Sequence, residues 1–229
     1  MGSFIVIIVL SYLLGSIPTS LWMGKLYKGI DIRDYGSGNA GATNTFRMLG
    51  WKAGLVVSLI DIAKGFTAAY YISQLGYYVG DVPTVISVWE TDIFMRIIAG
   101  AAAVSGHMYP LYASFKGGKG VITAAGMLYG IEPYSISIVL VFFAIILFTS
   151  RYVSLSSILA SIIYPISLLI FRYLMNWDID GSLIVLSAIL SALIVIKHKT
   201  NIKRLMEGKE NRISSFSPSK GRLNEKQTT

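Results

Sequence analysis

Long apolar runs separated by short polar stretches divide this chain of 229 residues. A run of about 20 apolar residues can cross the hydrocarbon core of a bilayer as a helix, whereas a membrane β-barrel would show alternation with period two. The pattern therefore predicts an all-α integral membrane protein with seven transmembrane helices. The predicted segments are Phe4–Lys25, Lys52–Leu75, Ile93–Leu111, Lys119–Gly130, Pro133–Thr149, Tyr152–Met175 and Ser182–Ile196.

Two of these segments carry special features. The fourth, with its apolar part at Val121–Gly130, is too short to span straight, so we expect it to tilt, to thin the bilayer or to pack inside the bundle. Glu132-Pro133 predicts a tight turn after it, because proline cannot continue a helix. In the first segment, the small and polar residues 15–20 favour close helix packing and a bend. The alternative to seven helices is that one weak segment is miscounted.

Composition agrees with a membrane protein, because only 14% of the residues are charged and the mean hydropathy is +0.61. When alternate loops are assigned to one side, that side carries 17 of the 20 Lys and Arg residues. The positive-inside rule then places the N-terminus outside and the C-terminus in the cytoplasm. We expect residues 1–212 to form one transmembrane domain and residues 213–229 a polar, disordered cytoplasmic tail.

The one-sided distribution of Lys and Arg also explains the formal net charge of +8, so this charge does not indicate nucleic acid as a partner. The N-terminus lacks a basic n-region and a small-residue cleavage site, which favours a retained first helix over a signal peptide. The absence of cysteine excludes disulfides and Cys-ligated metals, and two histidines give no ligand cluster. We therefore expect no metal and no cofactor.

The first predicted cytoplasmic loop reads Gly-Ser-Gly-Asn-Ala-Gly-Ala-Thr-Asn-Thr-Phe-Arg over residues 36–47. It contains a formal G-x-G-x-x-G, but a dinucleotide site needs a preceding strand, and here a transmembrane helix precedes. The glycines and short polar side chains offer many hydrogen-bond donors, and Arg47 can hold phosphate with two parallel bonds. The alternative is an ordinary solvated turn before a helix.

The second loop, residues 106–120, combines His107, Lys116 and Lys119 with four glycines. Glycines let backbone N–H groups approach an anion, and lysines attract phosphate. The following short helix would add the positive end of its dipole. A Walker A loop is not indicated, because Lys119 is followed by Gly120 and not by Ser or Thr. The alternative is that the lysines reflect membrane topology alone.

The third cluster, residues 197–210, places His198 and Asn201 three positions apart, on one face of a helix. Its apolar stripe suits the membrane interface; the alternative is a basic flank that only anchors the last helix. Asp61 and Lys64 are also three apart, inside the second segment. Charges in lipid must pair or face a cavity, so we favour a structural ion pair between them over a catalytic role.

These clusters supply more cations and donors than one phosphate group needs, which favours two phosphate groups. Acyl transfer from an activated lipid to a soluble phosphorylated alcohol fits such a cleft at a membrane surface. Two other classes stay open at this point: a transporter for phosphate or a small organophosphate, and a non-catalytic lipid-binding scaffold. The absence of an internal inverted repeat argues mildly against the transporter.

Three motifs carry a family resemblance: Gly-Ser-Gly-Asn-x-Gly-Ala-Thr-Asn-x-x-Arg (36–47), Gly-His-x-x-Pro-x-x-x-x-Phe-Lys-Gly-Gly-Lys-Gly (106–120) and His-x-x-Asn-Ile-x-Arg-Leu-x-x-Gly-x-Glu (198–210). They resemble the cytoplasmic motifs of the bacterial acyl-phosphate:glycerol-3-phosphate acyltransferases, the PlsY family. Residues 15–18, 61–65 and 151–154 fit the same pattern. The resemblance extends to about Arg212, with a departure at Lys197, where the family has Arg.

The resemblance implies transfer of a fatty acyl group from acyl-phosphate, not from acyl-CoA or acyl carrier protein, to the sn-1 hydroxyl of sn-glycerol 3-phosphate. The products would be lysophosphatidic acid and phosphate, in the first acylation of bacterial phospholipid synthesis. It also implies a multi-pass protein of the bacterial inner membrane with a cytoplasmic active site. The expected partners are glycerol 3-phosphate, acyl-phosphate and bilayer lipids, and we expect a monomer.

Site residues follow from the motifs and the resemblance together. The expected catalytic residues are Ser37, Arg47, Lys116, His198 and Asn201. The expected substrate-binding residues are Gly36, Gly38, Asn39, Asn44, His107, Gly117, Gly118, Lys119, Gly120 and Ser154. Asp61, Lys64 and Glu210 are expected to be structural. The base could be His107, His198 or a substrate phosphate; we favour the substrate phosphate, with direct transfer, over a covalent acyl-Ser37.

Overall fold

The computed structural model describes residues 2–79 and 90–213, and each regular element in these residues is a helix. Single-turn 3-10 helices at Ile32–Asp34, Ile72–Gln74 and Leu111–Ala113 join some of the longer helices. The α-helices are α1 (Gly2–Gly15), α2 (Thr19–Lys28), α3 (Ala42–Leu49), α4 (Trp51–Tyr70), α5 (Leu75–Val79), α6 (Thr91–Met108), α7 (Val121–Ile131), α8 (Pro133–Ser150), α9 (Val153–Tyr173), α10 (Gly181–Lys197) and α11 (Lys199–Met206).

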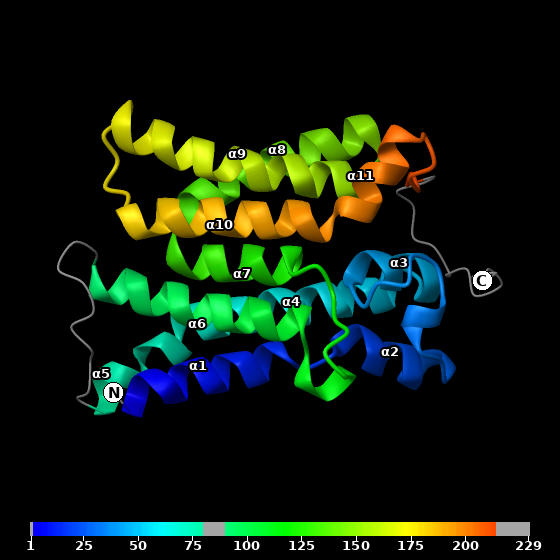
Figure 1. The fold of residues 1–229 in the computed structure, drawn as a ribbon, viewed down its shortest axis with the longest axis horizontal. Coiled ribbons are helices and arrows are strands. Elements are labelled where there is room, and N and C mark those ends of the chain that lie inside the picture. Colours follow the sequence, from blue (N-terminus) through cyan, green and yellow to red (C-terminus); the bar gives the residue numbers. More distant parts are fainter. Residues whose placement is uncertain (1, 80–89, 214–229) are drawn as a thin grey trace.

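The short helix α7 lies at the centre of the bundle. It packs against α4, α6 and α8, while α9 and α10 pack along one edge and α1 along the other (Figure 1). The main apolar core joins α4 with α6, α7, α8, α9 and α10 through buried residues such as Ile97, Met127, Leu168 and Leu183. Of the three arrangements expected for the short fourth segment, the structure adopts packing inside the bundle.

Glycines let α7 approach α4 at backbone distance. A Cβ on Gly65 would lie 2.0 Å from the carbonyl oxygen of Thr123, and a Cβ on Gly126 would lie 2.1 Å from that of Ile62. Small residues permit such close helix contacts in membrane proteins. The contact fixes the position of α7. It thereby also fixes the end of the second loop (106–120), the glycine-lysine loop, which precedes α7.

The bend expected in the first segment is a break between α1 and α2. Ile17 and Pro18 lie between the two helices, and Pro18 is not helical. A Cβ on Gly15 would lie 2.0 Å from the carbonyl oxygen of Ala103 in α6, so the close packing expected here is present as well. The break leaves backbone carbonyls without partners inside the helix.

The turn expected at Glu132-Pro133 is also confirmed. Pro133 is the first residue of α8, where its missing N–H costs no helical hydrogen bond. The Glu132 carboxylate accepts hydrogen bonds from the backbone N–H groups of Tyr134 at 3.1 Å and Ser135 at 2.6 Å. Glu132 therefore caps α8 in addition to ending α7.

In the described residues, four helical stretches are long and apolar enough to cross a membrane: Gly2–Lys28, Trp51–Tyr78, Pro133–Ser150 and Val153–Tyr173. A fifth is obtained if α10 and α11, which are bent by 59°, form one span. Two predicted segments fall outside this count because α7 is short and α6 contains Asp92, Arg96 and His107 within 18 residues. By length and composition the described residues thus contain four or five candidate spans, and the count of seven stays a prediction.

The polar loops gather at one end of the bundle. Figure 1 shows α2, α3 and α11 together at the end opposite to the start of α1. The second loop, between α6 and α7, opens towards the same end. The predicted tail at 213–229 lies outside the described residues except for Ile213.

Candidate functional site

Asn44, on α3, holds the first loop in shape. Its Oδ1 accepts a hydrogen bond from the backbone N–H of Ser37 at 3.0 Å. Its Nδ2 donates to the backbone carbonyls of Ile32 and Tyr35, both at 3.0 Å. The residue is 1% exposed, and these bonds use both of its amide protons. The Asn44 side chain is therefore bound to the backbone of its own loop.

Glycine is required beside Asn44. Gly36 has φ +61°, and a Cβ on it would lie 2.3 Å from Oδ1 of Asn44. Gly38 has φ +69°, which also favours glycine. In this turn the backbone N–H of Ser37 faces Asn44, and Ser37 as a whole is exposed. Arg47 lies on the last turn of α3 and is half-buried.

Arg33 ties the first loop to the second. Its Nε and Nη2 donate to the Asp31 carboxylate, at 2.6 Å for the Nη2–Oδ2 bond. Its Nη1 donates to the backbone carbonyls of Ala113 at 3.1 Å and Lys116 at 3.3 Å. The hydrogen bonds from Arg33 hold the pKa of the Asp31 carboxyl below its usual value. Arg33 thus fixes the backbone from which the Lys116 side chain extends.

The second loop closes over His107. The backbone N–H of Gly118 donates to the His107 carbonyl at 3.1 Å. A Cβ on Gly117 would lie 2.1 Å from that carbonyl oxygen, and one on Gly118 would lie 2.2 Å from Nε2 of His107. Gly120, with φ +80°, then leads into α7. Lys116 is exposed on the surface of this loop.

A buried polar cluster lies at the break between α1 and α2. Asp61 and Lys64 form an ion pair with 2.7 Å between Oδ1 and Nζ, and both side chains are at most 3% exposed. Thr19 donates from its hydroxyl to Oδ1 of Asp61 at 2.9 Å, and Lys64 donates to the Ile17 carbonyl at 2.8 Å. Nδ1 of His107 lies 3.7 Å from the same Asp61 oxygen. The cluster joins α2, α4 and α6.

Glu210 organises the third cluster. Its Oε1 accepts hydrogen bonds from Oγ of Ser154 at 2.9 Å and from Nδ2 of Asn201 at 2.7 Å, and its Oε2 accepts from Nε of Arg204 at 2.7 Å. Burial alone would raise the pKa of the Glu210 carboxyl, but these three donors outweigh burial and hold the pKa below its usual value. Glu210 therefore stays ionised and joins α9 to α11.

Lys119 connects the second loop to this third cluster. Its Nζ donates a hydrogen bond to Oδ1 of Asn201, whose amide nitrogen is bound to Glu210. Burial lowers the pKa of the Lys119 ammonium to about 8, although the Glu210 carboxylate opposes the shift. Near neutral pH the Lys119 side chain is thus mostly a buried cation, and the nearby Glu210 carboxylate balances its charge only in part.

His198 lies at the bend between α10 and α11. Its Nδ1 lies 2.8 Å from the Ile194 carbonyl oxygen, so Nδ1 carries the proton and Nε2 is the basic nitrogen. The residue is 3% exposed. Lys197, next to it, places Nζ 3.9 Å from the centre of the Tyr109 ring in the second loop. The end of α10 therefore contacts the second loop directly.

Together these contacts bring the three sequence clusters to one end of the bundle. Arg33 joins the first loop to the second, and Lys119 joins the second to the third. Ser37 and His198 donate hydrogen bonds to different neighbours, to Oδ1 of Asn44 and to the carbonyl oxygen of Ile194. Among residues 2–79 and 90–213, no group of three His, Cys, Asp or Glu side chains is placed to hold a metal ion.

Three residues that connect the site were not among the expected site residues. These are Arg33 between the loops, Thr19 on the Asp61 carboxylate and Arg204 on Glu210. Arg204 lies within a basic stretch and Arg33 in a predicted cytoplasmic loop, where positive-inside topology already accounts for an arginine. Thr19 could have been found from the buried charge at Asp61, which needs donors beyond its lysine.

Comparison with known proteins gives one family. A family model described as glycerol-3-phosphate acyltransferase matches residues 5–208. A glycerol-3-phosphate acyltransferase of Salinibacter ruber is 45% identical over 225 residues, covering 97% of this chain and 98% of the relative. One of Chlorobaculum tepidum is 47% identical over 234 residues, covering 93% and 98%.

Two solved structures share the fold. Both are crystal structures of PlsY (YgiH), an integral membrane glycerol 3-phosphate acyltransferase, one in the glycerol 3-phosphate form and one in the lysophosphatidic acid form. The first is 34% identical with a TM-score of 0.77, and the second is 35% identical with a TM-score of 0.75. Each match covers 93% of this chain and 96% of the other.

Proposed function

Because this chain belongs to the glycerol-3-phosphate acyltransferase family, we propose that it acylates the sn-1 hydroxyl of sn-glycerol 3-phosphate with acyl-phosphate as donor. The products are lysophosphatidic acid and phosphate. The observation that carries the proposal is the Lys119–Asn201–Glu210–Ser154 network, which joins the second motif (106–120) to the third (198–210) and to Ser154 of α9. The two forms of the solved relative support the acceptor and the product.

The charges of the site favour a donor that carries phosphate. Arg47, Lys116 and Lys119 lie on elements at one end of the bundle, and glycerol 3-phosphate needs only part of this charge. A second phosphate group, on the acyl donor, would bind the remaining cationic groups, since guanidinium and ammonium groups form strong hydrogen bonds with phosphate. We assign Lys116 and the glycines of its loop to glycerol 3-phosphate, and Ser37 and Arg47 to the reacting acyl-phosphate.

Acyl transfer from acyl-phosphate requires little covalent chemistry from the protein. The substrate hydroxyl oxygen attacks the acyl carbonyl carbon, the bond from that carbon to the phosphate oxygen breaks, and the hydroxyl proton passes to a phosphate oxygen. The protein positions the two substrates and stabilises the charge that develops on the carbonyl oxygen and on the leaving phosphate. His198 supplies Nε2 as an acceptor for the substrate, and Asn201 is oriented by Lys119 and Glu210.

We assign the remaining motif residues by their contacts. Gly36, Gly38, Asn39, Gly117, Gly118 and Gly120 shape the two loops against the substrates. Asn44 and His107 act through the loops they support, since Asn44 binds loop backbone and His107 lies under Gly118. Ser154 orients Glu210 from α9. Asp61, Lys64 and Glu210 hold the framework.

We further propose the membrane setting. The chain crosses the bacterial inner membrane seven times as a monomer, with its N-terminus outside and its active site facing the cytoplasm. The concentration of Lys and Arg in α2, α3, α11 and their loops supports this orientation. The acyl chain of the donor lies between helices within the bilayer, while its phosphate reaches the polar end of the bundle.

The proposal is tested by assay of the purified protein with glycerol 3-phosphate and one of three donors: acyl-phosphate, acyl-CoA or acyl carrier protein. We expect lysophosphatidic acid and phosphate only with acyl-phosphate. Arg47→Gln should remove most of the activity, whereas Lys52→Gln, an exposed change at the start of α4, should leave it intact. Activity with acyl-CoA alone would overturn the donor, and loss of activity in both variants would overturn the assigned role of Arg47.

A further inference from the structure

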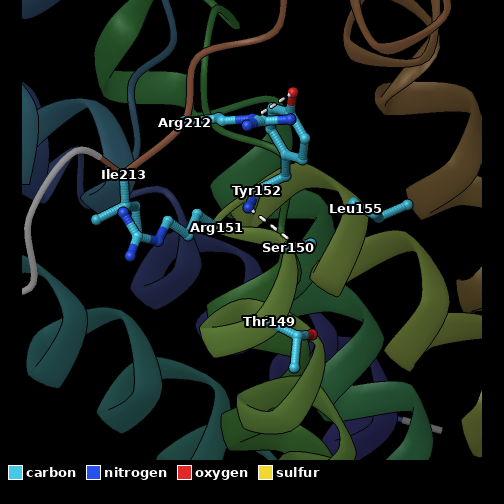
Figure 2. Close-up of a pocket in the computed structure, with 7 residues that line it drawn as sticks. All are labelled: Thr149, Ser150, Arg151, Tyr152, Leu155, Arg212 and Ile213. Atoms are coloured by element: carbon cyan, nitrogen blue, oxygen red, sulfur yellow. Dashed lines mark hydrogen bonds between the residues drawn. The ribbon is translucent and has the colours of Figure 1, made fainter.

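A basic pocket lies beside the turn between α8 and α9. Its volume is about 490 Å³, and its lining residues are Thr149, Ser150, Arg151, Tyr152, Leu155, Arg212 and Ile213 (Figure 2). The backbone N–H of Ile213 donates to the Arg151 carbonyl at 2.8 Å, which brings the chain after α11 against this turn. The proposed reaction assigns no role to this pocket.

Two guanidinium groups line the pocket without a carboxylate partner in the described part of the chain. Nε of Arg212 donates to the Tyr152 hydroxyl at 2.7 Å, and its guanidinium lies 4.9 Å from the ring centre (Figure 2). Arg151 is exposed and forms none of the ion pairs seen in residues 2–79 and 90–213. Glu210, two residues before Arg212, is already bound by Ser154, Asn201 and Arg204.

Arg151 is also held in place by its backbone. It ends α8 with φ +62°, a left-handed conformation that non-glycine residues adopt rarely, and its N–H donates to the Leu147 carbonyl. Glycine or asparagine would fit this position with less strain. The backbone thus fixes the direction in which the Arg151 side chain leaves the turn, and a guanidinium at the mouth of a pocket can bind phosphate through paired N–H groups.

The walls of the pocket indicate which phosphate compound fits. Its volume exceeds that of a single phosphate ion and lies in the range of sites for small organic ligands. Leu155 forms an apolar part of the lining, and Phe148, which precedes Thr149, is 62% exposed on α8. Ile145, one turn earlier, is 53% exposed. Exposed apolar side chains thus lie on α8 in the turn that precedes the basic pocket.

We propose that this pocket binds the phosphate headgroup of an anionic membrane lipid, with an acyl chain lying along α8. Arg151 and Arg212 hold the phosphate, and Tyr152 orients Arg212. Because Tyr152 is two residues before Ser154, and Arg212 is two residues after Glu210, a bound lipid stabilises both ends of the Ser154–Glu210 hydrogen bond. The proposal does not depend on which acyl donor the enzyme uses.

Thermal unfolding of the full-length protein in neutral detergent tests it, because a ligand that binds the folded state raises the midpoint with concentration. The probes are dihexanoyl phosphatidic acid, dihexanoyl phosphatidylcholine and inorganic phosphate. We expect phosphatidic acid to raise the midpoint, and Arg151→Gln/Arg212→Gln to weaken its apparent affinity at least tenfold. The charge-matched control Lys25→Gln/Lys28→Gln, at two exposed residues of α2, should change it less than twofold.

Two further comparisons separate this pocket from other phosphate sites. If Lys116→Gln weakens the binding of phosphatidic acid and Arg151→Gln/Arg212→Gln does not, the lipid binds at the active site and the proposal is wrong. If inorganic phosphate binds as tightly as phosphatidic acid, the ligand is free phosphate and the lipid assignment is overturned. Arg151→Gln alone, which leaves the Arg212–Tyr152 contact intact, provides the measurement if the double variant unfolds early.

Discussion

The ammonium group of Lys119 donates a hydrogen bond to the side-chain oxygen of Asn201, and the amide nitrogen of Asn201 donates to Glu210. The glycine-lysine loop and the last helix of the bundle are thereby joined through one amide. Because Asn201 uses its oxygen for a cation and its nitrogen for an anion, a side chain that cannot both accept and donate does not replace it.

Replacement of Asn201 tests this link. Asn201→Leu keeps the branching of the side chain at Cγ and removes both hydrogen bonds, so Lys119 and Glu210 each lose a partner on the inside of the site. We expect kcat/KM for glycerol 3-phosphate to fall at least tenfold, which corresponds to about 1.4 kcal/mol or more. Lys203→Gln, an exposed change on the same helix, is the control. A fall of equal size in both variants would argue against the link.

The lowered pKa of Lys119 predicts a pH dependence. Below about pH 8 the ammonium is charged and attracts phosphate; above about pH 8 it loses its proton and the attraction is lost. We therefore expect kcat/KM for glycerol 3-phosphate to decline as pH rises through 8. Arginine keeps its charge in this range, so Lys119→Arg should move the decline to higher pH. The same profile in wild type and Lys119→Arg would assign the decline to another group.

The three hydrogen bonds of Asn44 predict a large effect on stability. Asn44→Asp keeps an acceptor for the Ser37 N–H but removes both donors, which leaves the carbonyls of Ile32 and Tyr35 facing a carboxylate. We expect a loss of about 1–3 kcal/mol for each unsatisfied buried group, measured by thermal unfolding in detergent. Thr43→Ala, an exposed change on the same helix, should change stability by less than about 0.5 kcal/mol.

The Asp61–Lys64 pair predicts non-additive effects. Removal of one partner, as in Asp61→Leu, leaves a buried charge and should cost about 3–5 kcal/mol. The double variant Asp61→Leu/Lys64→Met leaves no unpaired charge and should be more stable than Asp61→Leu alone. A double-mutant cycle by equilibrium unfolding measures the coupling. If the two single effects add, the pair does not act as a unit, and separate roles for each residue would follow.

Direct transfer predicts that no acyl-enzyme forms. Rapid mixing of the protein with labelled acyl-phosphate in the absence of glycerol 3-phosphate should leave the protein unlabelled, and addition of the acceptor should give labelled lysophosphatidic acid. Labelled protein that reacts onward when the acceptor is added would establish a covalent intermediate, and its loss in Ser37→Ala would place the acyl group on Ser37.

Helix positions followed from the sequence because apolar run length and proline position are local properties. The Glu132-Pro133 turn and the break near Pro18 are examples. The number of spans did not follow as simply, because α7 is too short to span a bilayer by itself and packs against α4 and α6 inside the bundle. Its burial depends on Gly65 and Gly126, whose partners lie on another helix.

The site was predictable as a set of motifs but not as a set of contacts. The motifs named Lys119, Asn201 and Glu210, whereas their order in one hydrogen-bonded chain depends on the bend between α10 and α11. Asn44 illustrates the limit further. An asparagine in a polar loop offers the same donors to a ligand or to its own backbone, and only the fold around Gly36 decides between them.

The bridge between Lys119 and Asn201 spans 82 positions of the chain, and Glu210 follows nine positions later. During synthesis, the glycine-lysine loop is therefore complete long before its partners leave the ribosome. The proposed catalytic centre can form only after the final helix has been made and has folded back. We therefore expect chains that end before α11 to lack the Lys119–Asn201 hydrogen bond and the activity proposed to depend on it.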